Sequence, residues 1–348
     1  MQTLLAIGGT DPAGCSGITA DLRVFAAFGH HGAAVVTAVT AQNTRAFSAA
    51  EPVTPALIGE QLRVVFSDLR PAAATVGMLG DEATARAVET ALRGQSLPFV
   101  LDPVLVSSTG TPLLTAGAQA TLIDQLGRRA ALVTPNVPEL EALTGLAIRD
   151  SADLARAAQV LVGRGCIAVL AKGGHLTAAR GHDVLVTRDR VLHFDAPSPF
   201  GVTNDRGTGG ALAAAIASGL ALGQTLVDAV GVARRFVQRA LVAGYSVGAG
   251  PGPVDAFFAW RGALAAARGV GRLHVLTDDG PGARYSATEL VAHALRGGAD
   301  TLQIRDKSST SDRARILLAR GPVALCRAAG RTVIINDRAD IARALGAD

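Results

Sequence analysis

Short apolar runs alternate with stretches of helical periodicity over most of the chain. Five of these runs are typical of buried strands: LLAIG (4–8), AAVVTAV (33–39), FVLDPV (99–104), ALVTPN (131–136) and CIAVLAKGG (166–174). Strands that alternate with helices form βα units, in which the crossover helices cover both faces of a parallel sheet. The pattern therefore predicts an α/β fold with a mainly parallel sheet.

Residues that satisfy free backbone groups mark the starts of several helices. Thr54 followed by Pro55 predicts one helix start, and Asp81 predicts another. The run VLVTRDRVLHF (184–194) differs, because it has two alternating stretches around residues 188–189. That arrangement predicts a hairpin instead of a βα unit.

Residues 209–233 are apolar enough to resemble a membrane span. Gly223-Gln224 and Asp228 interrupt the run, which favours two buried helices, 208–222 and 225–242, that close the first domain. The N-terminus, MQTLLAIGGT, has no basic stretch, and its apolar run is too short for a signal peptide. We therefore expect a cytoplasmic protein that does not bind membranes.

The composition changes after Trp260. Residues 261–271 are rich in Ala, Gly and Arg and are typical of a linker or a linking helix. Three further strands follow, RLHVLTD, TLQIRD and TVIIND, each with a helical period after it. The sequence thus predicts a first domain over 1–260, a linker over 261–271 and a smaller α/β segment over 272–348.

Composition and charge narrow the choice of ligand. The 348 residues carry a net charge of +4, with 18% charged and 4% aromatic residues. The basic residues are scattered and aromatics are scarce, which argues against nucleic acid, whereas mild basicity suits phosphorylated ligands. The 3 cysteines are far apart and form no C-x-x-C pair, so neither a zinc site nor a disulfide framework is indicated.

Polar side chains stand at the carboxyl ends of three predicted strands. They are Asp102, Asn136 and Lys172. Because ligands of open α/β sheets bind just beyond those ends, we expect the chemistry at this one edge.

Two glycine-rich turns precede predicted helices. In RGTGGALAAAIASGL (206–220), converging backbone N–H groups and a helix N-terminus would form an anion cradle. The turn in GGTDPAGCSGITADL (8–22) is neither a Walker A loop nor a G-x-G-x-x-G turn. By itself, this second turn suits a purely structural role equally well.

Several polar residues have two interpretations. Asn136 and Glu139 form an N-x-x-E pair that suits a water-coated Mg²⁺ beside phosphates, or equally a helix cap. Lys172 suits a transferring phosphoryl group, or a solvated surface position. His30 and His31 are adjacent, so their side chains point apart, which favours surface histidines over a metal site.

Together these motifs resemble the hydroxymethylpyrimidine and phosphomethylpyrimidine kinases of thiamine synthesis, in the ribokinase-like superfamily. The resemblance runs in order through LLAIGGTDPAG, AQNTRAF (41–47), GML (77–79), LDPV (101–104), TPNVPE, AKGGH, RGTGG and GPVDAFFAW (252–260). It implies a three-layer α/β/α sandwich with a small β lid or hairpin, ATP and Mg²⁺ as cofactors, and a homodimer.

The resemblance also implies roles for individual residues. The pyrimidine would lie among Gly9, Ser16, Asp21, Thr40, Gln42, Met78 and Val104. The amide of Gln42 would read the amino and nitrogen edge of the ring, since it offers both a donor and an acceptor. The nucleotide site would use Asp102, Asn136, Glu139 and Lys172, with Mg²⁺ held by Asp102 and Glu139 through water. The turn Gly207, Thr208, Gly209 and Gly210 would be the anion hole, with Lys172 on the γ-phosphate.

The turn departs from the family pattern at its last position. The family ordinarily has Gly-Thr-Gly-Cys, and wider ribokinase-like kinases have aspartate there, whereas this chain has Gly210. Cys15 and Thr19 also replace the usual glycine and glutamine. An alcohol must lose a proton to attack ATP, but a phosphate monoester, with a second pKa of about 6, is already mostly ionised. We therefore hypothesise that the second phosphorylation is better preserved than the first.

The last segment resembles the start of thiamine-phosphate synthase, a (β/α)₈ barrel enzyme, through RLHVLTD, LQIRDK (302–307) and VIINDRADIARALGAD (333–348). The residues implied for a partial synthase site are Gln303, Arg305, Lys307, Asn336 and Asp337. Three βα units do not close an eight-stranded barrel. We therefore expect no synthase activity and interpret the segment as an incomplete TIM-barrel-like part of a truncated or frameshifted fusion.

Two alternatives to a pyrimidine kinase remain. A pyridoxal-type vitamin kinase shares the scaffold, although Gln42 and the GPVDAFFAW stretch favour the pyrimidine enzyme. A catalytically weakened pyrimidine-binding or regulatory module would explain Gly210. Stabilisation by hydroxymethylpyrimidine without turnover of ATP would indicate such a module.

Overall fold

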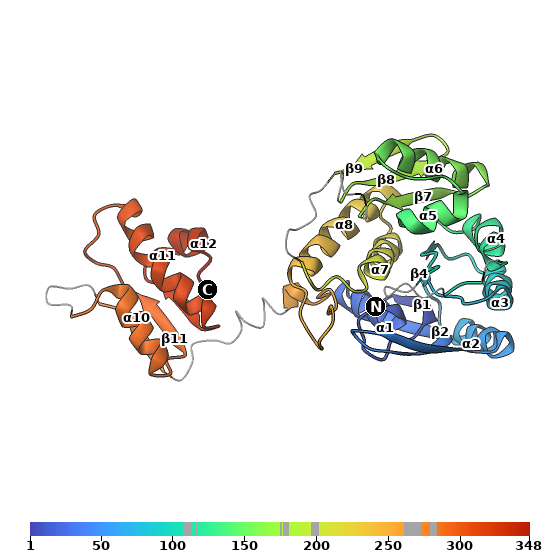
Figure 1. Cartoon of the computed structure of the whole chain (residues 1–348). Coiled ribbons are helices and arrows are strands. Elements are labelled where there is room, and N and C mark those ends of the chain that lie inside the picture. The colour runs from blue at the N-terminus through green and yellow to red at the C-terminus, as the bar shows by residue number, and fades with distance from the viewer. Residues whose placement is uncertain are drawn as a thin grey trace. The chain divides into compact units, whose positions relative to one another are not determined.

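The computed structural model describes residues 1–106, 113–115, 117–174, 176, 181–195, 202–260, 273–278 and 284–348. The chain forms two compact units, Met1–Phe258 and Ala259–Asp348 (Figure 1). The predicted linker over 261–271 lies outside the described residues.

The first unit is built on a 9-stranded sheet in the order β3-β2-β1-β4-β5-β6-β7-β8-β9. Pairs from β2 to β7 are parallel, whereas β3 at one edge and β8 and β9 at the other run antiparallel to their neighbours. The prediction of a mainly parallel sheet is confirmed, and so is the hairpin. The strands are β1 (Thr3–Gly9), β2 (His31–Gln42), β3 (Phe47–Pro52), β4 (Ala73–Val76), β5 (Phe99–Leu101), β6 (Leu132–Val133), β7 (Ala168–Lys172), β8 (Asp183–Thr187) and β9 (Val191–Phe194).

Helices cover both faces of this sheet. The side chains of β1 show this, because successive residues pack against helices on opposite faces. Leu4 and Ala6 pack into an apolar cluster with α1, α7 and α8, whereas Leu5 and Ile7 pack on the opposite face with α2, α3, α5 and α6 (Figure 1). The result is a three-layer sandwich. The helices are α1 (Gly17–Ala27), α2 (Pro55–Asp68), α3 (Glu82–Arg93), α4 (Ala118–Thr121) with a π-helical turn (Leu122–Gly127), α5 (Val137–Thr144), α6 (Ser151–Gly163), α7 (Thr208–Ala221) and α8 (Leu226–Val242).

The predicted helix starts carry the expected caps. The Thr54 side chain accepts a hydrogen bond from the backbone N–H of Leu57, and that of Asp81 accepts one from Thr84. The apolar stretch 209–233 falls in two helices, α7 and α8, separated by a turn, as expected. Among the described residues, no helix has the length and apolar character needed to cross a membrane.

Sequence patterns misplaced some boundaries. The strands β5 and β6 end at Leu101 and Val133, earlier than predicted, so Asp102 and Asn136 stand on loops just past the sheet.

The prediction that His30 is a surface residue is wrong, since its side chain is buried at the end of the α1–β2 turn. Burial lowers the pKa of His30.

The second unit is a 3-stranded parallel sheet in the order β10-β11-β12. Each predicted strand is present and is followed by a helix. The elements are β10 (His274–Leu276), α10 (Ala287–Arg296), β11 (Thr301–Ile304), α11 (Asp312–Ala328), β12 (Thr332–Ile335) and α12 (Ala339–Leu345). A small apolar core, which includes Leu302, Val323 and Val333, joins the sheet to its helices.

Candidate active site

The glycine turn before α7 is shaped by close backbone packing. Gly207 has φ +78°, and a Cβ at this position would lie 2.2 Å from the backbone oxygen of Cys15. Only glycine fits both the left-handed conformation and this contact. The turn between β1 and α1 is therefore packed directly against the N-terminus of α7, where free N–H groups and the helix dipole favour an anion.

The turn between β1 and α1 is organised by Asp11, which sequence reasoning missed. This buried carboxylate accepts hydrogen bonds from the backbone N–H groups of Ala13, Cys15 and Ser16, and from the Ser16 hydroxyl at 2.8 Å. Ser16, a predicted pyrimidine contact, thus uses its hydroxyl to hold the turn. The signal was the aspartate in TDPAG, since a short acceptor in a turn commonly binds nearby N–H groups.

Asp102 and Lys172 form an ion pair at the carboxyl ends of β5 and β7. The Lys172 Nζ lies 2.8 Å from Asp102 Oδ1, and the two side chains are only 13% and 11% exposed. The solvated-surface interpretation of Lys172 is therefore wrong. Burial alone would lower the pKa of Lys172, but the carboxylates of Asp102 and Glu139 outweigh it and raise that pKa, so the lysine stays charged. Thr134, which was not singled out, donates to Asp102 Oδ1 at 2.9 Å.

The glycine turn faces this ion pair. A Cβ on Gly209 would lie 3.2 Å from Lys172 Nζ and 3.5 Å from Asp102 Oδ2. The lysine ammonium and the N-terminus of α7 therefore converge on one small region beyond the sheet edge. An anion in that region would meet the Lys172 ammonium and the free N–H groups of α7, with the Asp102 carboxylate beside them.

Asn136 and Glu139 form a capping box at the start of α5, so the capping interpretation is confirmed. The Asn136 side chain accepts from the backbone N–H of Glu139 at 2.9 Å, and Glu139 Oε2 accepts from that of Asn136 at 2.8 Å. Asn136 also pairs with Lys172 in a short parallel bridge, which brings the cap to the ion pair. Burial raises the pKa of Glu139 to about 7, against the lowering effect of Lys172.

Several residues predicted to surround a pyrimidine lie at or near the carboxyl ends of β1, β2, β4 and β5. A Cβ on Gly9 would stand 2.9 Å from Met78 Sδ, so Gly9 and Met78 are in contact. The Thr40 hydroxyl donates to the backbone oxygen of Thr10 at 2.7 Å. Val104 follows Asp102 closely, with its N–H bonded to the Asp102 backbone oxygen at 2.8 Å.

The amide of Gln42 already has partners. Its Nε2 donates to Thr40 Oγ1 at 3.1 Å, and its Oε1 accepts from Arg206 Nη2 at 3.0 Å. The buried Arg206 also donates to the backbone oxygen of Asn43 at 2.8 Å. Arg206 belongs to the RGTGG motif, but the motif alone indicates no role for it. It ties the glycine turn to the end of β2 and fixes which way the Gln42 amide points.

Asp21 is a buried carboxyl group beside Gly210. A Cβ on Gly210 would lie 3.2 Å from Asp21 Oδ1, while Asp21 Oδ2 accepts from the Thr75 hydroxyl at 2.9 Å. Burial raises the pKa of Asp21 to about 7, the Thr75 hydrogen bond lowers it, and the charge of Asp102 raises it further. A carboxyl group therefore faces the position where the glycine turn carries no side chain.

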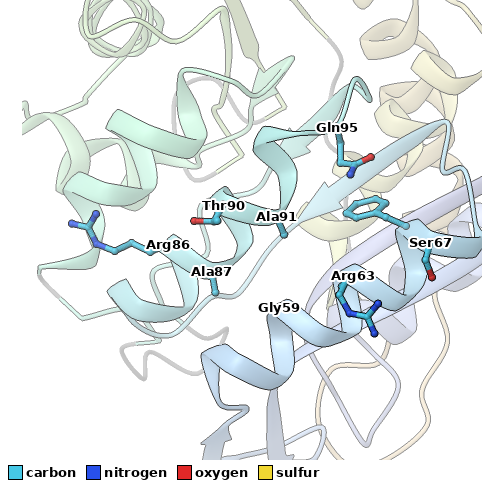
Figure 2. A pocket seen from close by; sticks show the side chains of 9 residues that line it. Gly59, Arg63, Ser67, Arg86, Ala87, Thr90, Ala91 and Gln95 are labelled. Atoms are coloured by element: carbon cyan, nitrogen blue, oxygen red, sulfur yellow. The ribbon is translucent and has the colours of Figure 1, made fainter.

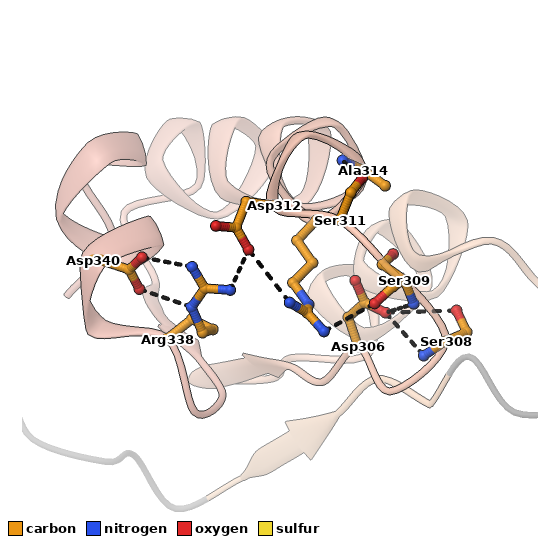
Figure 3. Close-up of polar contacts among 9 residues, drawn as sticks. Asp306, Ser308, Ser309, Ser311, Asp312, Ala314, Arg338 and Asp340 are labelled. Atoms are coloured by element: carbon orange, nitrogen blue, oxygen red, sulfur yellow. Dashed lines mark hydrogen bonds and ion pairs between the residues drawn. The ribbon is translucent and has the colours of Figure 1, made fainter.

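The residues singled out in the second unit gather at the carboxyl ends of β11 and β12. Gln303 donates to Asn336 Oδ1, and Lys307 forms an exposed ion pair with Asp337. Arg305 lies 3.4 Å from Asp278. A hollow of about 170 Å³ is lined by Lys307, Asn336 and Asp337 together with Arg338. Figure 3 shows Arg338 bonded to Asp312 and Asp340.

Two further observations bear on where ligands bind. A hollow of about 660 Å³ lies between α2 and α3 (Figure 2), and its lining includes Arg63, Phe66 and Arg86 but none of the predicted site residues. Within the described ranges, no three His, Cys, Asp or Glu side chains are grouped to hold a metal ion. A divalent ion at the sheet edge would thus need oxygens from water or ligand phosphates as well as from the protein, as Mg²⁺ commonly does.

Comparisons with known proteins agree with this division of the chain. A family model described as phosphomethylpyrimidine kinase matches residues 11–255, and one described as thiamine monophosphate synthase matches residues 273–348. A hydroxymethylpyrimidine/phosphomethylpyrimidine kinase of Rhizobium meliloti is 41% identical over 259 residues, which cover 74% of this chain and 97% of that protein.

Two other proteins extend the likeness. A probable thiamine biosynthetic bifunctional enzyme, chloroplastic, of rice is 35% identical over 363 residues, covering 99% of this chain and 65% of that protein. The structure of pyridoxal kinase from Staphylococcus aureus in complex with ADP has a TM-score of 0.68 at 28% identity, over 74% of this chain and 93% of that one. The first unit thus has the ribokinase-like fold of such kinases.

Proposed function

The chain belongs to the phosphomethylpyrimidine kinase family, and we propose that it transfers the γ-phosphoryl group of ATP to hydroxymethylpyrimidine and to the monophosphate of that pyrimidine, which yields the diphosphate used in thiamine synthesis. The observation that carries this proposal is the convergence of the Lys172–Asp102 ion pair on the N-terminus of α7. Phosphoryl transfer depends mainly on positioning and on stabilising charge, and this arrangement supplies both.

The nucleotide would bind where these positive groups meet. Lys172 would contact the γ-phosphate, and the N–H groups of Gly207–Gly210 would hold the transferring oxygens. Asp102 and Glu139 would hold Mg²⁺ through water, with Asn136 beside the phosphates. The residues fit such an ion, because the carboxyl groups of Asp102 and Glu139 both lie near Lys172 and Asp102 Oδ2 faces the turn. When bound, Mg²⁺ neutralises phosphate charge.

The pyrimidine would lie among Gly9, Ser16, Asp21, Thr40, Gln42, Met78 and Val104. Its amino and nitrogen edge would exchange hydrogen bonds with Gln42, whose amide orientation is fixed by Arg206. The alternative of a pyridoxal-type kinase has support from the S. aureus pyridoxal kinase, which shares the fold. Pyridoxal is therefore the appropriate competing substrate in every assay.

Two measurements on the purified chain test the proposal together. Thermal-shift titration with hydroxymethylpyrimidine reports binding, and an ADP-release assay reports transfer. We expect stabilisation with turnover, and turnover with pyridoxal much lower than with either pyrimidine. Stabilisation without ADP release would instead identify a pyrimidine-binding or regulatory module.

The two phosphorylations should differ in their dependence on position 210. The monophosphate, already ionised, needs no proton acceptor, whereas the alcohol does. We predict that Gly210→Cys raises kcat/KM for the alcohol several-fold more than for the monophosphate, measured as steady-state rates on both substrates. Equal gains on both would contradict the idea that the second step is the better preserved.

The remaining assignments are also proposals. The second unit, with its three parallel strands, would correspond to the first βα units of a TIM-barrel-like synthase, with Gln303, Arg305, Lys307, Asn336 and Asp337 at their carboxyl ends. We further propose a cytoplasmic location and a homodimer, both on family likeness.

A further inference from the structure

The position opposite Gly210 is filled by a side chain from another element. Asp21 lies in the middle of α1, and its Oδ1 is 3.2 Å from where a Cβ on Gly210 would stand. The carboxyl is held there because Oδ2 accepts from Thr75 on β4 at 2.9 Å. Thr75 is itself only 2% exposed, so both partners are fixed by packing. One carboxylate oxygen is thus anchored while the other faces the glycine turn.

Other groups near the turn are engaged elsewhere. The Thr208 hydroxyl donates to the backbone oxygen of Asp205. Lys172 is charged and paired with Asp102, and Glu139 caps α5. Of these groups, Asp21 alone combines a carboxyl with direct proximity to the end of the turn where family members carry a cysteine.

We propose that Asp21 is the proton acceptor for phosphorylation of the alcohol in this chain, as a partial replacement for the side chain that Gly210 lacks, which leaves the first phosphorylation weaker than the second. This inference rests on the proposed function. In the step, the hydroxymethyl O–H bond breaks and its proton passes to Asp21 Oδ1. The oxygen forms a bond to the γ-phosphorus of ATP, and the bond from that phosphorus to the β–γ bridging oxygen breaks, which releases ADP. The proton later leaves to solvent.

The surroundings of Asp21 suit this role. Burial raises its pKa to about 7, so the group exchanges protons near neutral pH, where a general base works best. The charge that acts on it comes from Asp102 beyond β5, which is itself paired with Lys172. Thr75 on β4 and Gly210 on α7 add no charge. For the monophosphate, whose attacking oxygen is already ionised, Asp21 has no proton to accept.

The decisive variant is Asp21→Asn, which keeps the shape and the Thr75 contact but cannot accept a proton. With ATP saturating, we expect kcat on the alcohol to fall about 10²- to 10⁴-fold, and kcat on the monophosphate to fall by a much smaller factor. No transfer to either substrate by the unaltered chain would overturn the proposed function and this inference with it. Equal losses on both substrates would overturn the role of Asp21 alone.

A fold check accompanies this variant. Because the pKa of Asp21 is raised in the folded chain, its ionised form destabilises the fold as pH rises through about 7. Replacing it by Asn removes that charge, so the melting temperature at pH 8 should be unchanged or higher. A loss of activity that came with a lower melting temperature at pH 8 would count against the proposal.

A second pair of variants tests the role by pH alone. The Thr75 hydrogen bond lowers the pKa of Asp21, so Thr75→Val should raise that pKa. The acid limb of the kcat profile for the alcohol should then move to higher pH, whereas Thr75→Ser, which keeps the hydroxyl, should leave it in place. The monophosphate profile should show no such movement. An alcohol profile identical in the Val and Ser variants would contradict the role of Asp21.

Discussion

At the scale of single residues, close contacts determine which substitutions the site tolerates. Gly207 and Gly223 share the same φ of +78°, but a Cβ on Gly207 would strike the Cys15 backbone oxygen at 2.2 Å, whereas one on Gly223 would meet nothing within 4 Å. The two glycines therefore separate the cost of a left-handed conformation from the cost of a steric clash.

We predict that Gly223→Ala lowers the free energy of unfolding by about 1 kcal/mol and leaves both kinase rates intact. Gly207→Ala should cost more, on the order of 2–4 kcal/mol, and should abolish transfer to both substrates, because the turn must move away from Cys15. Chemical denaturation and steady-state rates on the same preparations check this. Similar stability losses in the two variants would show that the contact with Cys15 is unimportant.

Sequence patterns located many of these residues but not their partners. Asp102, Asn136 and Lys172 were predicted together because parallel strands end at one edge. Gln42 was expected to be free to read a ring, yet its amide is held by Arg206, a residue far away in the sequence. No local pattern encodes such a contact, since it depends on how α7 is placed against β2.

At the scale of elements, α5 combines a structural cap with the proposed nucleotide site. Asn136 Oδ1 accepts from the N–H of Glu139 at 2.9 Å, and Asp150 Oδ1 caps α6 in the same way, accepting from Asp153 at 2.8 Å. Asp150 is exposed and has no proposed role in the reaction. It is therefore a matched control for Asn136.

We predict that Asn136→Ala and Asp150→Ala each lower stability by about 1 kcal/mol, measured by denaturant unfolding. Only Asn136→Ala should also raise KM for ATP or lower kcat, by about tenfold or more in kcat/KM, because it removes an oxygen beside the phosphates and frees Glu139. If Asn136→Ala left kcat/KM unchanged, Asn136 would act only as a helix cap and would have no role in nucleotide binding.

Helices and strands were predicted correctly where the sequence has a clear hydrophobic period or a helix cap. The prediction failed where tertiary contacts determine whether a strand forms and where it ends. Thr54 and Asp81 marked helix starts correctly. The antiparallel strand β3 was missed because FSAAEP has no alternating pattern and is largely exposed, and it forms through pairing with the long strand β2. The strand β5 was predicted too long, since its backbone leaves the sheet at the site residue Asp102.

At the scale of the whole molecule, the chain carries two units with different family matches. The residues proposed for the kinase site all lie in Met1–Phe258, and those proposed for a partial synthase site lie in Ala259–Asp348. The rice protein matches both units, in the same order, over 99% of this chain. The product of the proposed kinase reaction is a substrate of the synthase reaction, but we do not expect three βα units to carry out that second reaction.

We propose that this chain moves a phosphoryl group from ATP to a pyrimidine monophosphate at the site formed by Lys172 and the N-terminus of α7. Phosphorus NMR of the full chain with Mg²⁺, ATP and the monophosphate would detect this transfer. We expect signals of the pyrimidine diphosphate to appear together with an equal amount of ADP, and we expect Lys172→Met to abolish both at a temperature at which the variant remains folded. Signals of ATP and monophosphate that persist unchanged, or diphosphate formed equally well by Lys172→Met, would contradict it.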